Sequence, residues 1–183
     1  MRVIAGKFKG RNLDVPKTDL RPTLDRTKET LFNILQFDIP EKNVLDLFAG
    51  SGNLGIEAMS RGANKVVFVD INKEATKIIK QNCVKCGCIN DVAIVNMPFD
   101  SAISGIKEKF DIVFADPPYQ SDMYFNILKR LDRSDVLNVD AIVVCEHSRE
   151  EDLPDKVGNL SKYRVKNMGK CGFSFYQYLG DVQ

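Results

Sequence analysis

LDLFAGSGNLG, residues Leu45–Gly55, joins an apolar segment to a glycine-rich loop. The apolar segment, Asn43–Phe48, is typical of a buried strand, and a helix is expected to follow the loop. Gly50, Gly52 and Gly55 have the spacing G-x-G-x-x-G. Glycines allow a tight turn and a close approach of the backbone to a ligand, whose polar groups then meet the N-terminus of the helix. The stretch therefore predicts the first unit of a nucleotide-binding α/β sheet.

A carboxylate follows at the spacing that such a sheet requires. The expected strand Lys65–Val69 ends at Asp70, about twenty residues after the glycines, where a Rossmann-like fold binds the ribose hydroxyls. This pattern suits NAD and other adenosine cofactors equally. Asp46 distinguishes NAD from the other adenosine cofactors, because the strand before the glycine loop of a dinucleotide-binding fold is usually apolar throughout. A carboxylate inside that strand suits a cationic amino group instead.

The third signal is Asp116-Pro117-Pro118-Tyr119, directly after the strand-like run Phe110–Ala115. Two prolines end a strand abruptly, because neither can donate to a ladder. Ligands bind at the carboxyl ends of strands in open α/β sheets. An acid, free carbonyls and an aromatic ring at such an end suit a planar, amine-bearing ring such as a nucleobase. The alternative is a Pro-Pro turn with a half-buried tyrosine.

Along the rest of the chain, the hydrophobic pattern indicates strands that alternate with helices. This order predicts a doubly wound, mostly parallel sheet. Further strands are expected at Val92–Asn96 and Ala141–Cys145, and helices at Leu24–Gln36, Lys73–Lys85, Ser101–Ile106 and Met123–Leu131. Two last strands, Tyr163–Met168 and Phe173–Leu179, are joined by a short connection and should form an antiparallel pair. The 183 residues are expected to form one domain, with residues 1–20 as an extension and 21–183 as the core.

Composition excludes several classes of protein. No apolar run reaches the length of a membrane span, so a soluble, cytoplasmic protein is expected. The five cysteines, without a signal peptide, indicate free thiols. Cys83, Cys86 and Cys88 lack a fourth ligand for tetrahedral zinc, so we expect no metal. His147, the single histidine, is expected to be structural.

Basic residues gather near both ends of a chain whose net charge is only +1. Residues 2–15 are expected to form a short hairpin, with strands at Arg2–Ala5 and Arg11–Val15. An RNA-binding role is expected for five of its residues: Arg2, Lys7, Phe8, Lys9 and Arg11. The second basic stretch contains Lys156, Lys162, Arg164, Lys166 and Lys170. The two stretches are expected to converge on one nucleic-acid face. The alternative is a solvated surface, with Phe8 packed on the domain.

Together these residues resemble a known family. Residues 45–55 resemble motif I of the class I S-adenosylmethionine-dependent methyltransferases, and residues 116–119 resemble the (Asp/Asn)-Pro-Pro-(Tyr/Phe) motif of nucleobase amino-methyltransferases. Further segments are similar to the 16S ribosomal RNA guanine-N2 methyltransferases of the RsmD type: Arg2–Lys7, Arg21–Thr23, Asp25-Arg26, Glu29–Asn33 and Glu57–Ala63. The resemblance covers nearly the whole chain.

The resemblance implies S-adenosylmethionine as cofactor, ribosomal RNA or the small ribosomal subunit as partner, and a monomer. The catalytic residues that it implies are Asp116, Pro117, Pro118 and Tyr119. The cofactor residues are Arg21, Thr23, Asp46, Phe48, Ala49, Gly50, Ser51, Gly52, Asp70, Ile71, Asn96 and Met97. Asn96-Met97 stands where the family often has an acid that reads the adenine amine. Two rival functions remain, a DNA adenine-N6 methyltransferase and a non-catalytic RNA-binding module.

Overall fold

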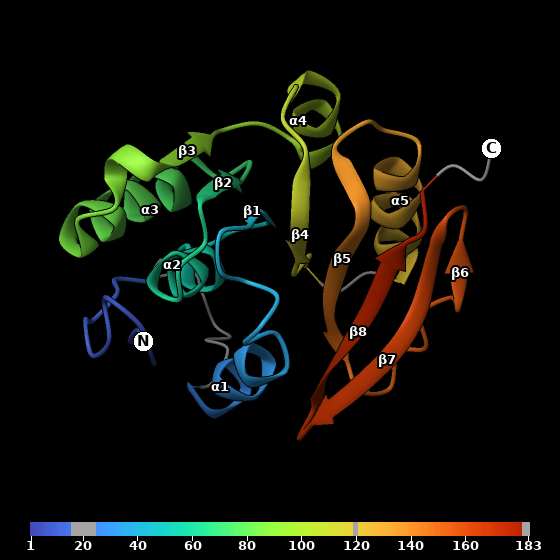
Figure 1. The fold of residues 1–183 in the computed structure, drawn as a ribbon, viewed down its shortest axis with the longest axis horizontal. Coiled ribbons are helices and arrows are strands. Elements are labelled where there is room, and N and C mark those ends of the chain that lie inside the picture. The colour runs from blue at the N-terminus through green and yellow to red at the C-terminus, as the bar shows by residue number, and fades with distance from the viewer. Residues whose placement is uncertain (16–24, 119–120, 181–183) are drawn as a thin grey trace.

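A computed structural model describes residues 1–15, 25–118 and 121–180 (Figure 1). These residues form an eight-stranded sheet with the order β3-β2-β1-β4-β5-β8-β7-β6. The first five strands in this order are parallel, and β8, β7 and β6 continue the sheet in antiparallel fashion. The strands are β1 Asn43–Leu47, β2 Lys65–Val69, β3 Val92–Val95, β4 Phe110–Ala115, β5 Leu137–Ser148, β6 Lys156–Val157, β7 Leu160–Met168 and β8 Cys171–Tyr178.

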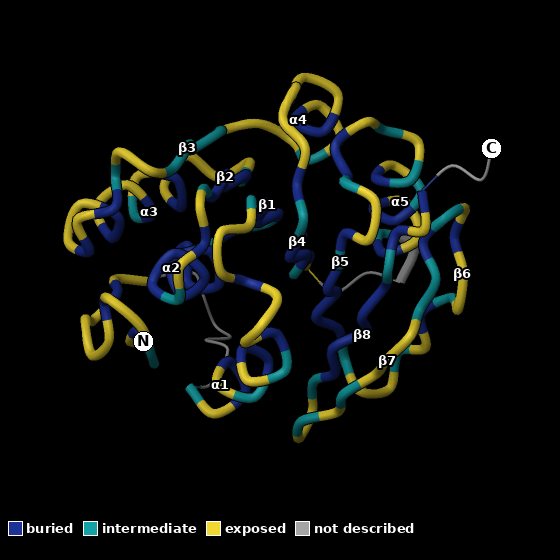
Figure 2. The backbone as a smooth tube through the Cα atoms, viewed as in Figure 1, coloured by how far each residue is buried: buried dark blue, intermediate teal, exposed yellow. Residues whose placement is uncertain are grey.

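Helices cover both faces of the parallel part. They are α1 Asp25–Ile34, α2 Asn53–Ser60, α3 Lys73–Cys86, α4 Phe99–Gly105 and α5 Ser121–Asp132, with a short 3-10 turn at Ile89–Asp91. Side chains alternate between the faces of a strand, so that Val44 packs in the core with α1, α2 and α3, whereas Leu45 packs in the core with α4 and α5. Figure 2 shows the buried strands between these layers. The expected α/β fold class, with its antiparallel C-terminal strands, is confirmed.

The expected N-terminal hairpin is present in a short form. Arg2 and Asn12 form an antiparallel bridge, the Val3 amide donates to the Arg11 carbonyl at 3.0 Å, and the Gly10 amide donates to the Val3 carbonyl at 2.9 Å. The pairing does not extend further, because the backbone amides of Ile4 and Ala5 donate to the Glu57 carboxylate at 2.8 and 3.0 Å. The N-terminal segment (residues 1–15) is therefore a short hairpin docked on α2.

Docking also corrects the expectation for Phe8, whose side chain is only 4% exposed and belongs to the core. Its amide donates to the Ser60 hydroxyl at 2.9 Å. Gly6, with φ 81°, passes so close to α2 that a Cβ there would lie 1.8 Å from the Ser60 carbonyl oxygen. Phe8 packs on the domain and cannot stack on RNA.

A buried ion pair joins the N-terminal segment, α1 and α2. Lys28 and Glu57 have fully buried side chains and lie 3.1 Å apart. The Lys28 ammonium also donates to the Arg2 carbonyl at 2.6 Å and to the Asn53 Oδ1 at 2.7 Å. Glu57 accepts a further bond from Arg61 at 2.8 Å. Burial lowers the pKa of Lys28, and the charge of the adjacent Glu57 opposes that shift. Because a buried charge without a partner is costly, each member of the network holds the others in place.

Replacing Glu57 by Gln should lower the free energy of unfolding by about 3–5 kcal/mol, because Lys28 would remain buried without its counter-charge. The matched control is Glu108→Gln, which removes an exposed ion pair with Lys65 and should cost less than about 1 kcal/mol. Urea denaturation of both variants measures the difference. Equal losses of unfolding free energy in the two variants would show that the buried ion pair stabilises the fold no more than the exposed pair does.

Candidate functional site

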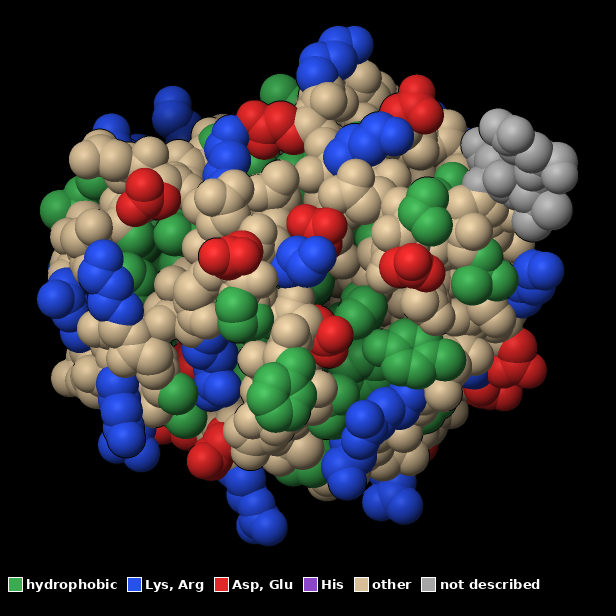
Figure 3. Space-filling model, in the orientation of Figure 1, with side chains coloured by type: hydrophobic (Ala, Val, Ile, Leu, Met, Phe, Trp, Pro, Cys, Tyr) green, Lys and Arg blue, Asp and Glu red, His purple; other side chains and the backbone are tan. Residues whose placement is uncertain are grey.

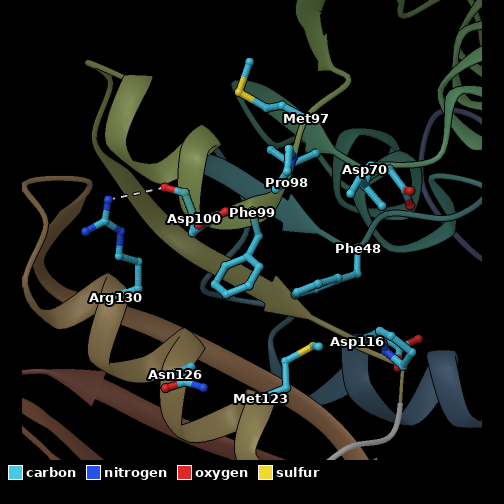
Figure 4. Close-up of a pocket in the computed structure, with 13 residues that line it drawn as sticks. Phe48, Asp70, Met97, Pro98, Phe99, Asp100, Asp116, Met123, Asn126 and Arg130 are labelled. Carbon is cyan, nitrogen blue, oxygen red and sulfur yellow. Dashed lines mark hydrogen bonds between the residues drawn. The ribbon is translucent and has the colours of Figure 1, made fainter.

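The carboxyl ends of β1, β2, β3 and β4 border one cavity of about 920 Å³. In Figure 4 the side chains of Phe48, Asp70, Phe99 and Asp116 surround it, with those of α5 on the opposite wall. The lining residues are Phe48, Val69, Asp70, Ile71, Met97, Pro98, Phe99, Asp100, Asp116, Pro118, Met123, Asn126 and Arg130. Six residues expected at the site thus lie together: Phe48, Asp70, Ile71, Met97, Asp116 and Pro118.

The glycine loop turns through backbone conformations that other residues rarely adopt. Gly50 and Gly52 have φ values of 56° and 77°. Phe48 also has a positive φ, 60°, although it is not a glycine. Its ring packs against Phe99 with 5.3 Å between the centroids. Such strain persists only where surrounding contacts hold it. Here the strained backbone orients the Phe48 ring so that it forms part of the cavity wall.

Asp70 ties the glycine loop to the end of β2. One carboxylate oxygen accepts the Gly50 amide at 2.8 Å, and the other accepts the Asn72 amide at 2.8 Å. A carboxylate offers about four acceptor positions, so both oxygens retain capacity for the two hydroxyls of a ribose. The loop and the expected ribose acid are fixed relative to each other before any ligand arrives.

Asn96 has a different role from the expected one. Its side-chain amide donates to the carbonyls of Asp70 and Ile71, at 2.9 and 3.0 Å. It is not among the residues that line the cavity. Asn96 therefore positions the turn after β2, and the wall on this side consists of Met97, Pro98 and Phe99.

Asp46 is buried beneath the loop, where its carboxylate accepts the Gly55 amide at 2.9 Å. It thereby supports the start of α2 and does not line the cavity. The pKa of Asp46 is raised, first by burial and then by the charges of Asp116 and Asp70, against the lowering effect of the Gly55 bond. Burial therefore favours the neutral form of Asp46, whereas the carboxylates of Asp70 and Asp116 line the cavity.

The expected catalytic motif begins at the end of β4. Asp116 is half-buried and lines the cavity, Pro117 is buried, and Pro118 is exposed at the rim. Tyr119, Arg21 and Thr23 lie outside the described residues. Of the other expected cofactor residues, Ala49 and Ser51 are buried in the loop behind the cavity wall.

Sequence analysis missed the part of the wall that α5 provides. Met123, Asn126 and Arg130 recur at intervals of three and four residues, which places them on one side of a helix. That spacing was the available signal. Arg130 donates to the Asp100 carbonyl at 3.4 Å, as the dashed line in Figure 4 marks, and so joins α5 to α4.

All five cysteines are free thiols. Among the described residues no group of three His, Cys, Asp or Glu side chains is arranged to hold a metal ion. His147 is buried, and its ring nitrogens lie 2.8 Å from the Ser174 hydroxyl and the Ser148 carbonyl, which confirms its structural role. No described helix has the length and apolar character needed to cross a membrane.

Taken together, the cavity fits a nucleoside that carries a cation. Ile71, Met97 and Pro98 form an apolar part of the lining that suits a flat base, Asp70 has acceptor oxygens that suit ribose hydroxyls, and the carboxylates of Asp70 and Asp116 suit a positive charge. S-adenosylmethionine has all three parts.

Comparison with known proteins gives concordant matches. The family model described as "Conserved hypothetical protein 95" matches residues 1–177. "Putative rRNA methyltransferase YlbH" of Bacillus subtilis is 36% identical, over 98% of this chain and 100% of that protein. "Ribosomal RNA small subunit methyltransferase D" of Escherichia coli K12 is 34% identical, over 97% of this chain and 89% of that protein. The solved structure "Putative methyltransferase yhhF from Escherichia coli" has a TM-score of 0.89 and 32% identity, and the match covers 99% of both chains.

Asp70→Ala should weaken binding of S-adenosylmethionine by about 2 kcal/mol, or roughly 30-fold, because the ribose would lose a charged acceptor. Isothermal titration of the folded variant measures this. Asp91→Ala, which removes an exposed acid away from the cavity, is the control and should bind normally. Unchanged affinity in Asp70→Ala would exclude the ribose assignment.

Proposed function

The chain belongs to the family described as conserved hypothetical protein 95, the family of ribosomal RNA small subunit methyltransferase D, and we propose from this and from the cavity that it methylates ribosomal RNA with S-adenosylmethionine. The membership confirms the resemblance drawn from the sequence. We further propose that the acceptor is the exocyclic N2 amine of a guanine in small-subunit RNA.

One observation carries the proposal. Asp116, the first residue of the Asp-Pro-Pro-Tyr motif, lines the same cavity as Asp70 and Phe48. A base amine held at Asp116 would therefore lie next to a cofactor whose ribose is held at Asp70. This arrangement suits direct transfer between two bound reactants, for which correct positioning provides much of the rate enhancement.

The cofactor would be held by residues already described. Asp70 would bind the ribose hydroxyls, and Ile71, Met97 and Pro98 would enclose the adenine. Gly50, whose amide is fixed on Asp70, would hold the loop close to the methionine part. When bound, S-adenosylmethionine supplies an electrophilic methyl group on a cationic sulfur.

Asp116 and the carbonyl of Pro117 would act on the nucleophile. The N2 lone pair of guanine is delocalised into the ring, and accepting its N–H bonds at these two oxygens would localise it on nitrogen. The nitrogen would then take the methyl group that the cofactor supplies, with the S–C bond breaking as the N–C bond forms, and Asp116 or water would take the proton that the product loses. The target base would have to leave its stack to enter, which costs less in an RNA loop than in a duplex.

Asp116→Ala should lower the methyl-transfer rate about 100-fold or more, because the variant cannot polarise the amine. Single-turnover assays on small-subunit RNA measure this, and binding of S-adenosylmethionine should stay within a few-fold of wild type. DNA should accept no methyl group from the wild-type protein. A wild-type rate of methyl transfer in Asp116→Ala would show that the end of β4 is not part of the active site.

The basic residues of the N-terminal segment form the proposed RNA contact. Figure 3 shows Lys and Arg side chains projecting from the lower edge of the molecule, around the N-terminal segment, α1 and β7. Lys7 and Lys9 are exposed. Arg2 is paired with Asp25 at 3.0 Å, and Arg11 donates to the Lys85 carbonyl. On the C-terminal side, Lys162 is held by Asp152 and Asp155. Lys7 and Lys9 are therefore the cations that we expect to meet phosphate most directly.

Changing Lys7 and Lys9 together to Ala should weaken RNA binding and flatten its salt dependence by about 1.4–1.8 units of slope, at roughly 0.7–0.9 per phosphate contact. Binding titrations at several salt concentrations measure the slope. The double variant Lys77→Ala/Lys80→Ala, which removes two exposed lysines from α3, controls for net charge. The same slope in both double variants would show that Lys7 and Lys9 are only solvated surface.

A further inference from the structure

Strand β7, which runs beside β8 (Figure 1), has an irregularity that turns two neighbouring side chains to one face of the sheet. Lys162 is opposite Tyr176 of β8, whereas Arg164 is opposite Phe175, so that Tyr163 is an extra residue. Such a β-bulge sets two residues of one strand against a single residue of its partner. Both side chains contact Phe175: the Tyr163 ring lies 5–7 Å away in the range of aromatic pairs, at 6.1 Å between centroids, and the Arg164 guanidinium lies 6.0 Å from the same ring.

The two side chains remain accessible to solvent although they cover a buried ring. Tyr163 is 51% exposed, and Arg164 is also exposed. The pKa of Tyr163 is raised by partial burial and then by the charge of Asp38, and the nearby positive charge of Arg164 opposes that shift. A half-exposed aromatic ring and a guanidinium thus form one surface unit, the Tyr163–Arg164 pair.

The Tyr163–Arg164 pair lies on the face of the sheet that α1 covers, three strands from the candidate site. Arg164 is opposite Phe175 of β8, which is opposite Val144 of β5. Val144 is in turn opposite Phe114 of β4, and all three apolar residues belong to the core that includes α1. With about 4.8 Å between neighbouring strands, the pair is about 14 Å from β4. Asp116 follows Phe114 by two residues, so a strand of a few nucleotides can span from the pair to a base at Asp116.

Further cations extend from the pair towards the carboxyl edge of the sheet. Lys166 lies on the same face as Arg164, two residues further along β7. Lys170 is exposed at the turn between β7 and β8, and this turn lies where β5 ends, because Ser148 is opposite Cys171. Within the described parts of the chain, Arg164, Lys166 and Lys170 form no ion pair with an acid. Their charge is complementary to a row of phosphates.

We propose that the Tyr163–Arg164 pair binds an unpaired nucleotide that flanks the target base in the RNA, with its base stacked on Tyr163 and its phosphate at Arg164. Every base has a flat face, so stacking on an aromatic side chain tolerates any sequence, while neighbouring cations follow the backbone. Lys166 and Lys170 lead the strand from the pair to the edge where the cavity lies. A duplex cannot make this contact, because its bases are already stacked on one another. The inference rests on the proposed function and assigns the surface that selects a single-stranded segment.

The test measures the affinity of a small-subunit RNA fragment whose methylated guanine lies in a loop, and of the same fragment annealed to its complementary strand. Tyr163→Leu keeps an apolar side chain on Phe175 but removes the stacking ring. This variant should bind the loop fragment about tenfold more weakly and the duplex as tightly as the wild-type protein does. Tyr163→Phe, which retains the ring, should bind both as the wild type does. Arg164→Gln should flatten the salt dependence for the loop fragment by about 0.7 units of slope.

Controls separate stacking from folding and from the proposed function itself. Val165→Ala changes an exposed apolar side chain on the other face of β7 and should leave both affinities unchanged. If Tyr163→Leu does not fold, Tyr163→Ala is measured in its place and should show the same selective loss. An unchanged affinity for the loop fragment in a folded Tyr163 variant, or an equal loss for loop and duplex, overturns the inference. Failure of the wild-type protein to methylate small-subunit RNA overturns the proposed function instead.

Discussion

The buried contact between Lys28 and Glu57 is the constraint on which the arrangement of the site depends. It joins α1 to α2 through two fully buried side chains, and each charge requires the other. Glu57 also accepts two amides of the N-terminal segment, so that residues from three distant parts of the chain meet at one carboxylate. α2 begins at the glycine loop and α1 packs over the ends of β4 and β5. The ion pair therefore fixes the distance between the cofactor loop and the proposed base site.

The carboxylates at the sheet edge have different tasks because their surroundings differ. Asp46 is buried on a backbone amide and supports the loop, while Asp70 has two amides and spare acceptor capacity at the cavity. Asp116 follows the end of β4 and lines the cavity. The carboxylates of Asp70 and Asp116 at the cavity are consistent with a positively charged cofactor.

The fold could be predicted in detail because its signals are local. The strands Lys65–Val69 and Phe110–Ala115 are observed with the expected bounds, since each is an apolar run ended by an acid or a proline. The part of the cavity wall proposed to hold the cofactor was predicted only partly, from the spacing between the glycine loop and Asp70. The rest depends on contacts between distant residues. Nothing in the local pattern indicates that Phe8 of the N-terminal segment packs in the core, or that Asn96 turns towards the Asp70 and Ile71 carbonyls.

The docking of the N-terminal segment has a consequence for the order of folding. Its amides bind Glu57, Ser60 and Asn82, which lie 52 to 68 residues later in the chain. During synthesis these partners have not yet been made when the first fifteen residues emerge. The contacts of the N-terminal segment therefore cannot form until α2 and α3 have formed. Contacts between residues so far apart in sequence are slow to form, because the loop between them must first close. The segment that we propose meets RNA is therefore expected to join the structure after the glycine loop that serves the cofactor.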